Sequence, residues 1–239
     1  MISHNHRCVF VHIPKCAGQS IDHVFLNNLG LNWETRAPLL LRYNERPEIG
    51  PPRLAHLKVE EYVRYKYLSQ ELLDQYFKFS FVRNPWDRLI SIYKYLDYDR
   101  KYEFKYFLMK IFANDIWKTK YWFVGPQYEY VCNSNGDVIV DYIGKFESLQ
   151  NDFNIICGKV NLPPTMLPHI NKSGNKAVAT KHPIKYLKDW VKNHKRNKFP
   201  QYSRYQDYYD NESREFAADL YKRDISIFGY TFDNDSNIK

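Results

Sequence analysis

The chain has 239 residues and a formal net charge of +8 at pH 7. This length fits a single α/β domain with a full hydrophobic core, and no apolar run approaches the roughly 18 residues that a membrane-spanning helix requires. The positive charge favours an anionic partner, but basic and acidic residues are interspersed and no known nucleic-acid-binding module is present, so we expect no nucleic acid partner.

The first predicted element is a buried strand over residues 8–13, which Pro14 ends. A tight loop with one glycine follows over residues 15–19, and apolar residues recur at helical spacing from Ser20 onward. Such a corner directs backbone N–H groups and the positive end of a helix dipole at one point. Lys15 adds a full charge, so we predict an anion site. The Walker loop differs, because its lysine directly precedes the helical Ser or Thr.

Residues 33–52 carry four prolines and read as a connecting loop. Their basic and aromatic composition equally fits a segment that grips a substrate. Residues 53–57 follow as a brief strand-like piece, and residues 58–73 are predicted to form one helix with an apolar stripe.

A second buried strand is predicted over residues 79–82, followed by a helix from Trp86. Arg83 therefore stands at the carboxyl end of a strand, where open α/β sheets bind ligands. Ser91 comes eight residues later, in the helix. A guanidinium fork and a hydroxyl that converge suit a terminal phosphate monoester. Taken singly, Arg83 could equally form a surface ion pair and Ser91 could face solvent.

The rest of the chain completes one α/β domain over residues 1–239, an open parallel sheet flanked by helices with a small hairpin insertion. The remaining elements are a helical aromatic region (98–122), a hairpin turn (133–137), a helix (149–160), an irregular basic segment (171–181), a closing amphipathic helix (211–228) and a polar tail (232–239) that we expect to be frayed. The four cysteines form no C-x-x-C pair, which argues against a disulfide framework or a zinc site.

Two motifs resemble those of a known family. The order P-K-x-x-G-x-S at residues 14–20 resembles the 5′-phosphosulfate loop of sulfotransferases that use 3′-phosphoadenosine 5′-phosphosulfate (PAPS). The pattern V-R-N-P-x-x-R-x-x-S-x-Y at residues 82–93 resembles the 3′-phosphate-binding segment of carbohydrate sulfotransferases, most closely the Golgi 2-O- and 4-O-type enzymes and their bacterial relatives. Weaker likenesses lie at residues 127–149, 167–173 and 208–232.

The resemblance implies a P-loop-like fold and transfer of a sulfuryl group from PAPS to a hydroxyl of a carbohydrate acceptor, with release of 3′-phosphoadenosine 5′-phosphate (PAP). It assigns the 5′-phosphosulfate to Lys15, Cys16, Ala17, Gly18, Gln19 and Ser20, the 3′-phosphate to Arg83 and Ser91, and, more loosely, a cofactor-covering loop to Lys172 and Ser173. No metal is expected, because Lys15 can neutralise the charge that grows on the bridging oxygen. We also expect the anion loop to lower the pKa of Cys16.

A base must take the proton of the acceptor hydroxyl, and a histidine with a pKa near neutrality suits that role. The segment Ala55-His56-Leu57 resembles the histidine segment of the 2-O- and 4-O-type enzymes, which makes His56 the candidate base. A carboxylate base, as in 3-O-type enzymes, is the alternative, and Glu60 and Glu61 are its candidates. His56 could also be a histidine that only caps a helix.

Two other functions stay open at this stage. A nucleotide kinase or another P-loop NTPase would share the sheet, but the sequence lacks G-K-S/T and a Mg²⁺-binding set. A non-catalytic basic protein could bind anionic polysaccharide. An acidic glycan acceptor would also fit the net charge. Because no leader pattern precedes the first strand, we expect a cytoplasmic protein that is a bacterial relative of the Golgi enzymes.

Overall fold

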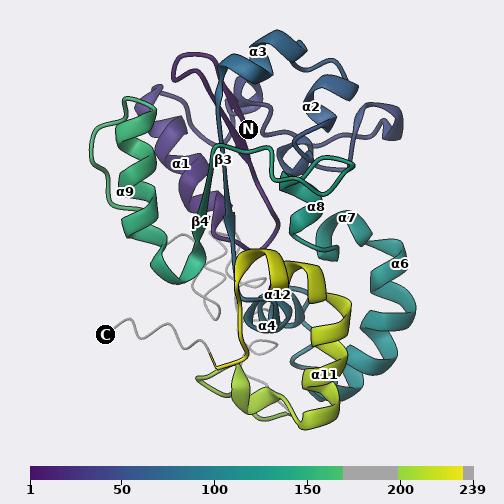
Figure 1. Ribbon diagram of the computed structural model, residues 1–239. Helices are drawn as coiled ribbons and strands as arrows, with labels where there is room; N and C mark the ends of the chain where they lie inside the picture. The colour runs from purple at the N-terminus through teal and green to yellow at the C-terminus, as the bar shows by residue number, and fades with distance from the viewer. Residues whose placement is uncertain (169–198, 234–239) are drawn as a thin grey trace, which may run out of the picture.

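Four strands form one open sheet in the computed structural model, which describes residues 1–168 and 199–233. Their order is β1 (Ile2–Ser3), β2 (Cys8–Val11), β3 (Phe77–Val82) and β4 (Tyr142–Lys145). The last three run parallel, as predicted, whereas β1 is antiparallel to β2 (Figure 1). The edge strand reverses because a tight turn over residues 4–7 leads directly back into β2.

Strands β2 and β3 form the centre of the sheet. Side chains of the surrounding helices and loops pack on both faces of these two strands. In their register Phe10 lies opposite Phe79, with ring centroids 5.0 Å apart. The buried hydroxyl of Ser80 donates to the carbonyl oxygen of Val11 at 2.6 Å. Strands buried on both faces read as near-continuous apolar runs, and these runs made both strands predictable.

Helices surround the sheet and extend beyond its carboxyl edge (Figure 1). They are α1 (Gly18–Asn28), α2 (Glu61–Arg64), α3 (Gln70–Gln75), α4 (Pro85–Tyr95), α5 (Phe104–Tyr106), the π-helix η4 (Phe107–Ile116), α6 (Trp117–Thr119), α7 (Tyr121–Val124), α8 (Tyr128–Val131), α9 (Leu149–Lys159), α11 (Asn211–Leu220) and α12 (Lys222–Phe228). The short 3₁₀ helices are η1 (Ala37–Leu39), η2 (Pro47–Ile49), η3 (Leu54–His56), η5 (Phe146–Ser148) and η6 (Gln206–Tyr208). The predicted helix over residues 149–160 is confirmed by α9.

Three predicted elements are wrong in extent or type. The single helix over residues 58–73 is two short helices, α2 and α3, because Lys66 is left-handed (φ 62°) and Ser69 caps a new helix start. Residues 53–57 form η3 instead of a strand, since Leu54 and Leu57, three positions apart, are both buried. The closing helix divides into α11 and α12 at Tyr221.

The aromatic region and the hairpin differ only in detail from the prediction. Helical structure begins at Phe104 and continues through η4 to Val124. The turn over residues 133–137 is present, with Asn133 N donating to Asp137 O at 2.9 Å. The turn connects Cys132 and Val138, which pair in a single isolated bridge. It does not connect two strands, because α8 directly precedes it.

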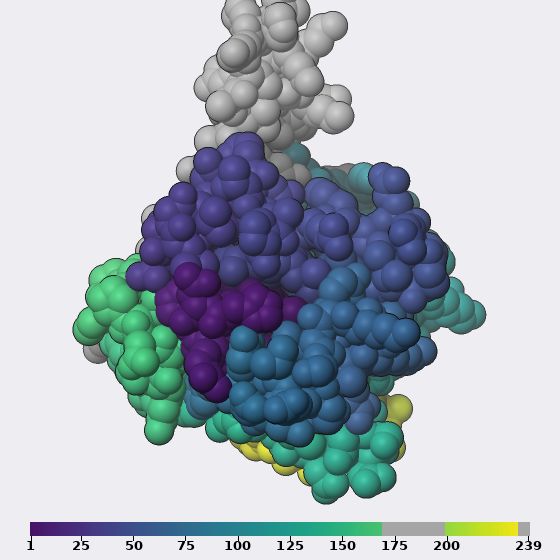
Figure 2. Space-filling view, turned by 90° about the horizontal axis from the view of Figure 1, so that it is seen from above, coloured from purple at the N-terminus to yellow at the C-terminus, as the bar shows by residue number. Residues whose placement is uncertain are grey.

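The described residues bury their apolar side chains in two clusters. One surrounds the sheet and includes α1, α2, α3, α8 and α9; the other surrounds α4 and includes α5, η4, α7 and α11. At the amino ends of β2 and β3, the purple N-terminal segment lies against the blue segment that contains α3 (Figure 2). A ring nitrogen of His4 and the Tyr76 hydroxyl share a hydrogen bond of 2.7 Å there. No described helix has the length and apolar character needed to cross a bilayer.

Candidate functional site

The corner between β2 and α1 has an unusual backbone. Lys15 and Ala17 both adopt left-handed conformations, with φ of 72° and 63°. This conformation costs a non-glycine residue about 1–2 kcal/mol, and such strain is concentrated at ligand-binding sites. Ala17 is the N-cap of α1 and offers no side-chain acceptor to the first N–H groups of the helix. The corner therefore presents an uncapped helix N-terminus, a place where anions bind favourably.

Gly18 is required here by close packing. A Cβ atom at this position would lie 2.0 Å from Nε2 of His12, inside any possible contact distance. The glycine therefore lets the start of α1 rest directly on the imidazole ring of His12. Sequence reasoning took this glycine for a turn former and did not identify the contact.

Lys15 is a cation without a counter-charge. Its Nζ lies 4.1 Å from the ring centroid of Tyr95, and no carboxylate comes within 4 Å of it in the described part of the chain. Burial and, after it, the nearby guanidinium of Arg83 lower the pKa of Lys15 to about 8. An anion bound at this corner would supply the missing charge and raise that pKa again.

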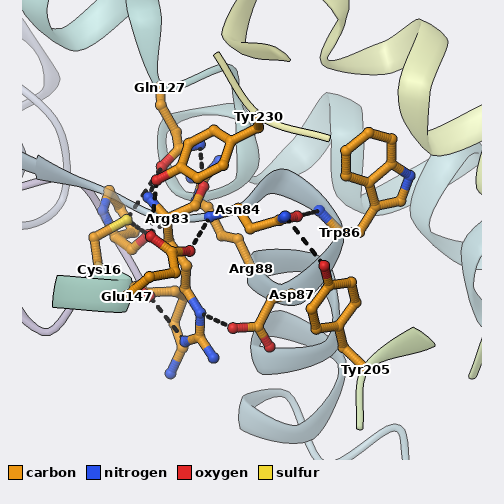
Figure 3. A network of polar contacts seen from close by, with 12 residues as sticks. Cys16, Arg83, Asn84, Trp86, Asp87, Arg88, Gln127, Glu147, Tyr205 and Tyr230 are labelled. Atoms are coloured by element: carbon orange, nitrogen blue, oxygen red, sulfur yellow. Dashed lines mark hydrogen bonds and ion pairs between the residues drawn. The ribbon is translucent and has the colours of Figure 1, made fainter. Parts of the chain in front are cut away.

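Arg83 reaches the first corner from the end of β3. Its Nη1 donates to the carbonyl oxygen of Lys15 at 3.2 Å, and its Nε donates to Oδ2 of Asp87 at 2.7 Å (Figure 3). Its guanidinium carbon also lies 4.0 Å from the ring centroid of Phe146. The two predicted cationic positions therefore meet at one edge of the sheet. The ion pair that the sequence left open for Arg83 exists as well, and Asp87 provides it.

Gln127 joins the two corners. Its Oε1 accepts from the backbone N–H of Arg83 at 2.9 Å and from Sγ of Cys16 at 3.3 Å, while its Nε2 donates to the carbonyl oxygen of Arg83 at 2.8 Å (Figure 3). Asp224 in turn accepts from the backbone N–H groups of Gln127 and Tyr128, each at 2.8 Å. Sequence reasoning missed Gln127 and Asp224, because the elements that carry them are far from both corners in the chain.

Arg88, the second arginine of the β3–α4 motif, is a structural residue. Its side chain is buried and donates to the backbone carbonyl oxygens of Pro14, Gly125 and Phe123 at 3.0, 2.9 and 3.2 Å. The first of these bonds fixes the loop before Lys15 to α4, and the other two fix the end of α7 to it. All of this guanidinium group's described hydrogen bonds go to the protein backbone, so we assign it no ligand.

The predicted low pKa of Cys16 is wrong. The side chain is only 1% exposed, and burial raises the pKa of its thiol to about 12. The thiol donates to Gln127 Oε1 at 3.3 Å and approaches the carbonyl oxygen of Pro14 at 3.7 Å. Cys16 is therefore a packed, protonated thiol beneath the loop, and desolvation outweighs the neighbouring positive charges.

His56 lies in η3 and is 8% exposed. Its Nδ1 is 2.8 Å from the carbonyl oxygen of His12, and a carbonyl can only accept, so Nδ1 carries the proton and Nε2 the lone pair of the neutral ring. Burial, followed by the neighbouring His12, lowers the pKa of His56 well below its usual value. A neutral imidazole is therefore bound to the backbone of His12, three residues before Lys15.

The other candidate residues have more varied positions. Gln19, Ser20 and Ser91 are half-buried, the first two in the first turn of α1 and the third on α4. Glu60 is exposed, whereas Glu61 accepts from the backbone N–H of Lys58 at 2.8 Å and lines a cavity together with His56. Lys172 and Ser173 lie outside the described residues. The described residues contain no group of three His, Cys, Asp or Glu side chains suited to a metal ion.

The chain matches the model of a known protein family. A family model described as "Sulfotransferase family" matches residues 1–231. A protein of Archaeoglobus fulgidus, named only as an uncharacterized protein, is 31% identical over 111 residues, which represent 45% of this chain and 87% of that protein. No solved structure matches the chain.

Proposed function

Because the chain belongs to the sulfotransferase family, we propose that it moves a sulfuryl group from PAPS to a hydroxyl of a carbohydrate acceptor and releases PAP. The observation that carries the proposal is the contact between Arg83 Nη1 and the Lys15 carbonyl oxygen at 3.2 Å. It places the Arg83 guanidinium against the backbone of the loop that carries Lys15, so both cationic residues lie just beyond the carboxyl ends of adjacent parallel strands, where α/β folds bind nucleotides.

The residues at this edge fit a donor with two separate anionic groups. Lys15, the loop from Cys16 to Ser20 and the uncapped start of α1 would hold the 5′-phosphosulfate. Arg83 would hold the 3′-phosphate, because its Nη2 makes no hydrogen bond with the described residues, and Ser91 would add a hydroxyl. In our proposal Lys172 and Ser173 cover the donor. The donor supplies an activated sulfuryl group whose S–O bond to the 5′-phosphate breaks during transfer.

Two side chains perform the chemistry in this proposal. The Lys15 ammonium neutralises the negative charge that develops on the bridging oxygen as the S–O bond breaks. His56 accepts the proton of the attacking acceptor hydroxyl at Nε2, since Nδ1–H is already bound to the His12 carbonyl oxygen. One S–O bond forms, one breaks, and the proton moves to the imidazole. No metal enters this scheme, because Lys15 supplies the counter-charge.

His56 is favoured over the two glutamates as the base. Glu60 is exposed, and Glu61 already accepts a hydrogen bond from the Lys58 N–H. The imidazole of His56 is neutral and keeps its Nε2 lone pair, as a base needs, but burial lowers its pKa well below the near-neutral value expected of that base. Glu61 shares a cavity with His56, so it is the carboxylate to test if His56 fails.

Calorimetric titration with PAP, and separately with ATP plus Mg²⁺, tests the proposal. We expect PAP to bind at least about tenfold more tightly, because only PAP carries a 3′-phosphate for Arg83. Arg83→Met should weaken PAP binding, and Lys118→Met, which removes an exposed charge on α6, should not. Tighter binding of ATP would favour an NTPase. Equal binding of all anions with a steep salt dependence would favour a non-catalytic polysaccharide-binding protein.

A further inference from the structure

The ammonium group of Lys15 lies over the face of an aromatic ring. Lys15 Nζ is 4.1 Å from the ring centroid of Tyr95, well inside the distance of about 6 Å at which a cation and a π face attract each other. Tyr95 is the last residue of α4, whereas Lys15 belongs to the loop before α1, so this contact joins the two strand-to-helix corners. Sequence reasoning gave Tyr95 no role, because it lies two residues beyond the motif at residues 82–93.

A neighbouring ring supports that of Tyr95. The ring centroid of Phe123 is 5.5 Å away, and the two ring planes are inclined by 37°. Arg88 Nη2 donates to the carbonyl oxygen of Phe123, and Arg88 Nε donates to that of Pro14, directly before Lys15. One buried guanidinium group therefore fixes both the loop that carries the ammonium and the residue against which the tyrosine ring packs.

The position of Tyr95 gives it little value as a core residue. Its side chain is 47% exposed, so much of its apolar surface stays in water and contributes little to stability. Ser91 lies four residues earlier in α4, which places both side chains on one face of the helix. The ring of Tyr95 therefore lies beside the donor edge, the edge of the sheet where Lys15 and Arg83 meet and where we place PAPS.

The full charges near Lys15 are positive. Burial first, and then the guanidinium groups of Arg83 and Arg88, lower the pKa of Lys15 to about 8. No carboxylate lies within 4 Å of Nζ in the described ranges, and the thiol of Cys16 is protonated. The π face of Tyr95 attracts the ammonium without neutralising it, as a carboxylate would.

We propose that Tyr95 is a positioning residue that holds the Lys15 ammonium in one place for the transfer step. A lysine side chain is a flexible four-carbon stem, and a charge that is already in position needs no reorganisation when the transition state forms. The inference rests on the proposed function, since Lys15 acts there on the bridging oxygen. It adds a residue that acts through Lys15 and needs no contact with the donor or the acceptor.

Two substitutions of Tyr95 separate the ring from the bulk. Tyr95→Leu removes the π face and keeps much of the side-chain volume, so its kcat at saturating donor should fall roughly three- to tenfold, with donor KM and PAP affinity unchanged. Tyr95→Phe keeps the ring and should retain most of the rate. Tyr106→Leu is the matched control, because it removes another exposed tyrosine that stacks on a neighbouring ring, that of Tyr102, and it should have no effect.

A second measurement follows the ammonium group directly and needs no turnover. Reductive methylation with ¹³C-formaldehyde labels the lysines for NMR and keeps their charge, and Lys15→Met identifies the Lys15 signal. The ring current of Tyr95 should move this signal upfield in the wild type and in Tyr95→Phe. In Tyr95→Leu the upfield shift should disappear, and the pKa of Lys15 should fall by roughly 0.5 to 1, because the ring favours the protonated form.

The inference and the proposed function can fail separately. A wild-type Lys15 signal without a ring-current shift, or the same Lys15 pKa in wild type and Tyr95→Leu, would show that the ring does not hold the ammonium. A kcat of Tyr95→Leu at or above the wild-type value would also overturn the inference, and so would a larger change in PAP affinity than in kcat. A wild type that binds no PAP and transfers no sulfuryl group would reject the proposed function, whatever the NMR signal of Lys15 shows.

Discussion

The two strand-to-helix corners at the edge of the sheet have the same outline but opposite character. The β2–α1 corner is open: its helix has no side-chain cap, Lys15 and Ala17 are strained, and Lys15 has no carboxylate within 4 Å among the described residues. The β3–α4 corner is closed on itself. Asn84 Oδ1 accepts from Trp86 N at 3.1 Å, and the Asn84 N–H donates to Glu147 at 2.7 Å.

This difference suggests a division of labour between the corners. Strain and an unpaired charge persist in a folded protein only when the surroundings fix them, and here Arg88 and Gln127 hold the loop from below. The first corner is therefore suited to stabilise charge that develops during a reaction. The second corner is internally satisfied, so it can hold Arg83 rigidly for binding. Substitutions at the first should affect turnover, and substitutions at the second should affect affinity.

The largest loss is expected at His56, which we propose as the base and which is bound to the His12 carbonyl oxygen. His56→Gln should lower kcat by about 10²–10⁴, the usual contribution of a general base, because the amide cannot accept the hydroxyl proton. PAP affinity, measured by calorimetry, should be unchanged, since His56 contacts the His12 carbonyl and not the donor edge. Activity near the wild-type value would exclude His56 as the base and move attention to Glu61.

Lys15→Met should come next, with kcat lowered by about 10²–10³, because in the proposed mechanism this side chain stabilises the charge on the leaving oxygen. Transfer from radiolabelled PAPS at saturating donor measures the effect. Lys15→Arg, which keeps the charge, should lose less. A variant that changes only the donor KM would show that the first corner binds its ligand uniformly and would break the contrast between the corners.

Arg83→Met should weaken PAP binding by roughly ten- to a hundredfold, since a charged hydrogen bond contributes about 1.5–3 kcal/mol. At saturating donor its kcat should stay close to that of the wild type. Asp87→Asn is the matched variant: it removes the partner of Arg83 Nε and keeps the guanidinium charge. A fall in kcat as large as that of Lys15→Met would mean that both corners act in the transition state.

The backbone of both corners could be predicted from the sequence, because local signals determine it. Continuous apolar runs marked the strands, helical periodicity marked α1 and α4, and Pro14 and Asn84 marked the boundaries. The meeting of Lys15 with Arg83 followed from parallel strands, whose carboxyl ends share an edge.

The connections between the corners could not be predicted in the same way. Gln127 and Asp224 are 97 residues apart, and their contact depends on how α8 and α12 pack. The Cys16 thiol failed as a prediction for a related reason: its pKa is determined by burial, which no local pattern reveals. The pocket that His12, Asp22 and His56 line likewise needs α1 and η3 to come together, which no local pattern predicts.

The smallest expected effect tests the electrostatic coupling of the corners. The pKa of Lys15 is lowered to about 8 by burial and by Arg83. The protonated amine is the active form, so kcat/KM should fall as pH rises through about 8. Stability should change in the opposite sense, because the unfolded state binds more protons between pH 8 and 10.5 and the free energy of unfolding therefore increases over that range. In Arg83→Met the falling limb should shift to higher pH, since one of the three influences that lower this pKa, which are burial, Arg83 and Arg88, is gone. An unshifted limb would mean that Lys15 and Arg83 act independently, and that burial and Arg88 account for the lowered pKa.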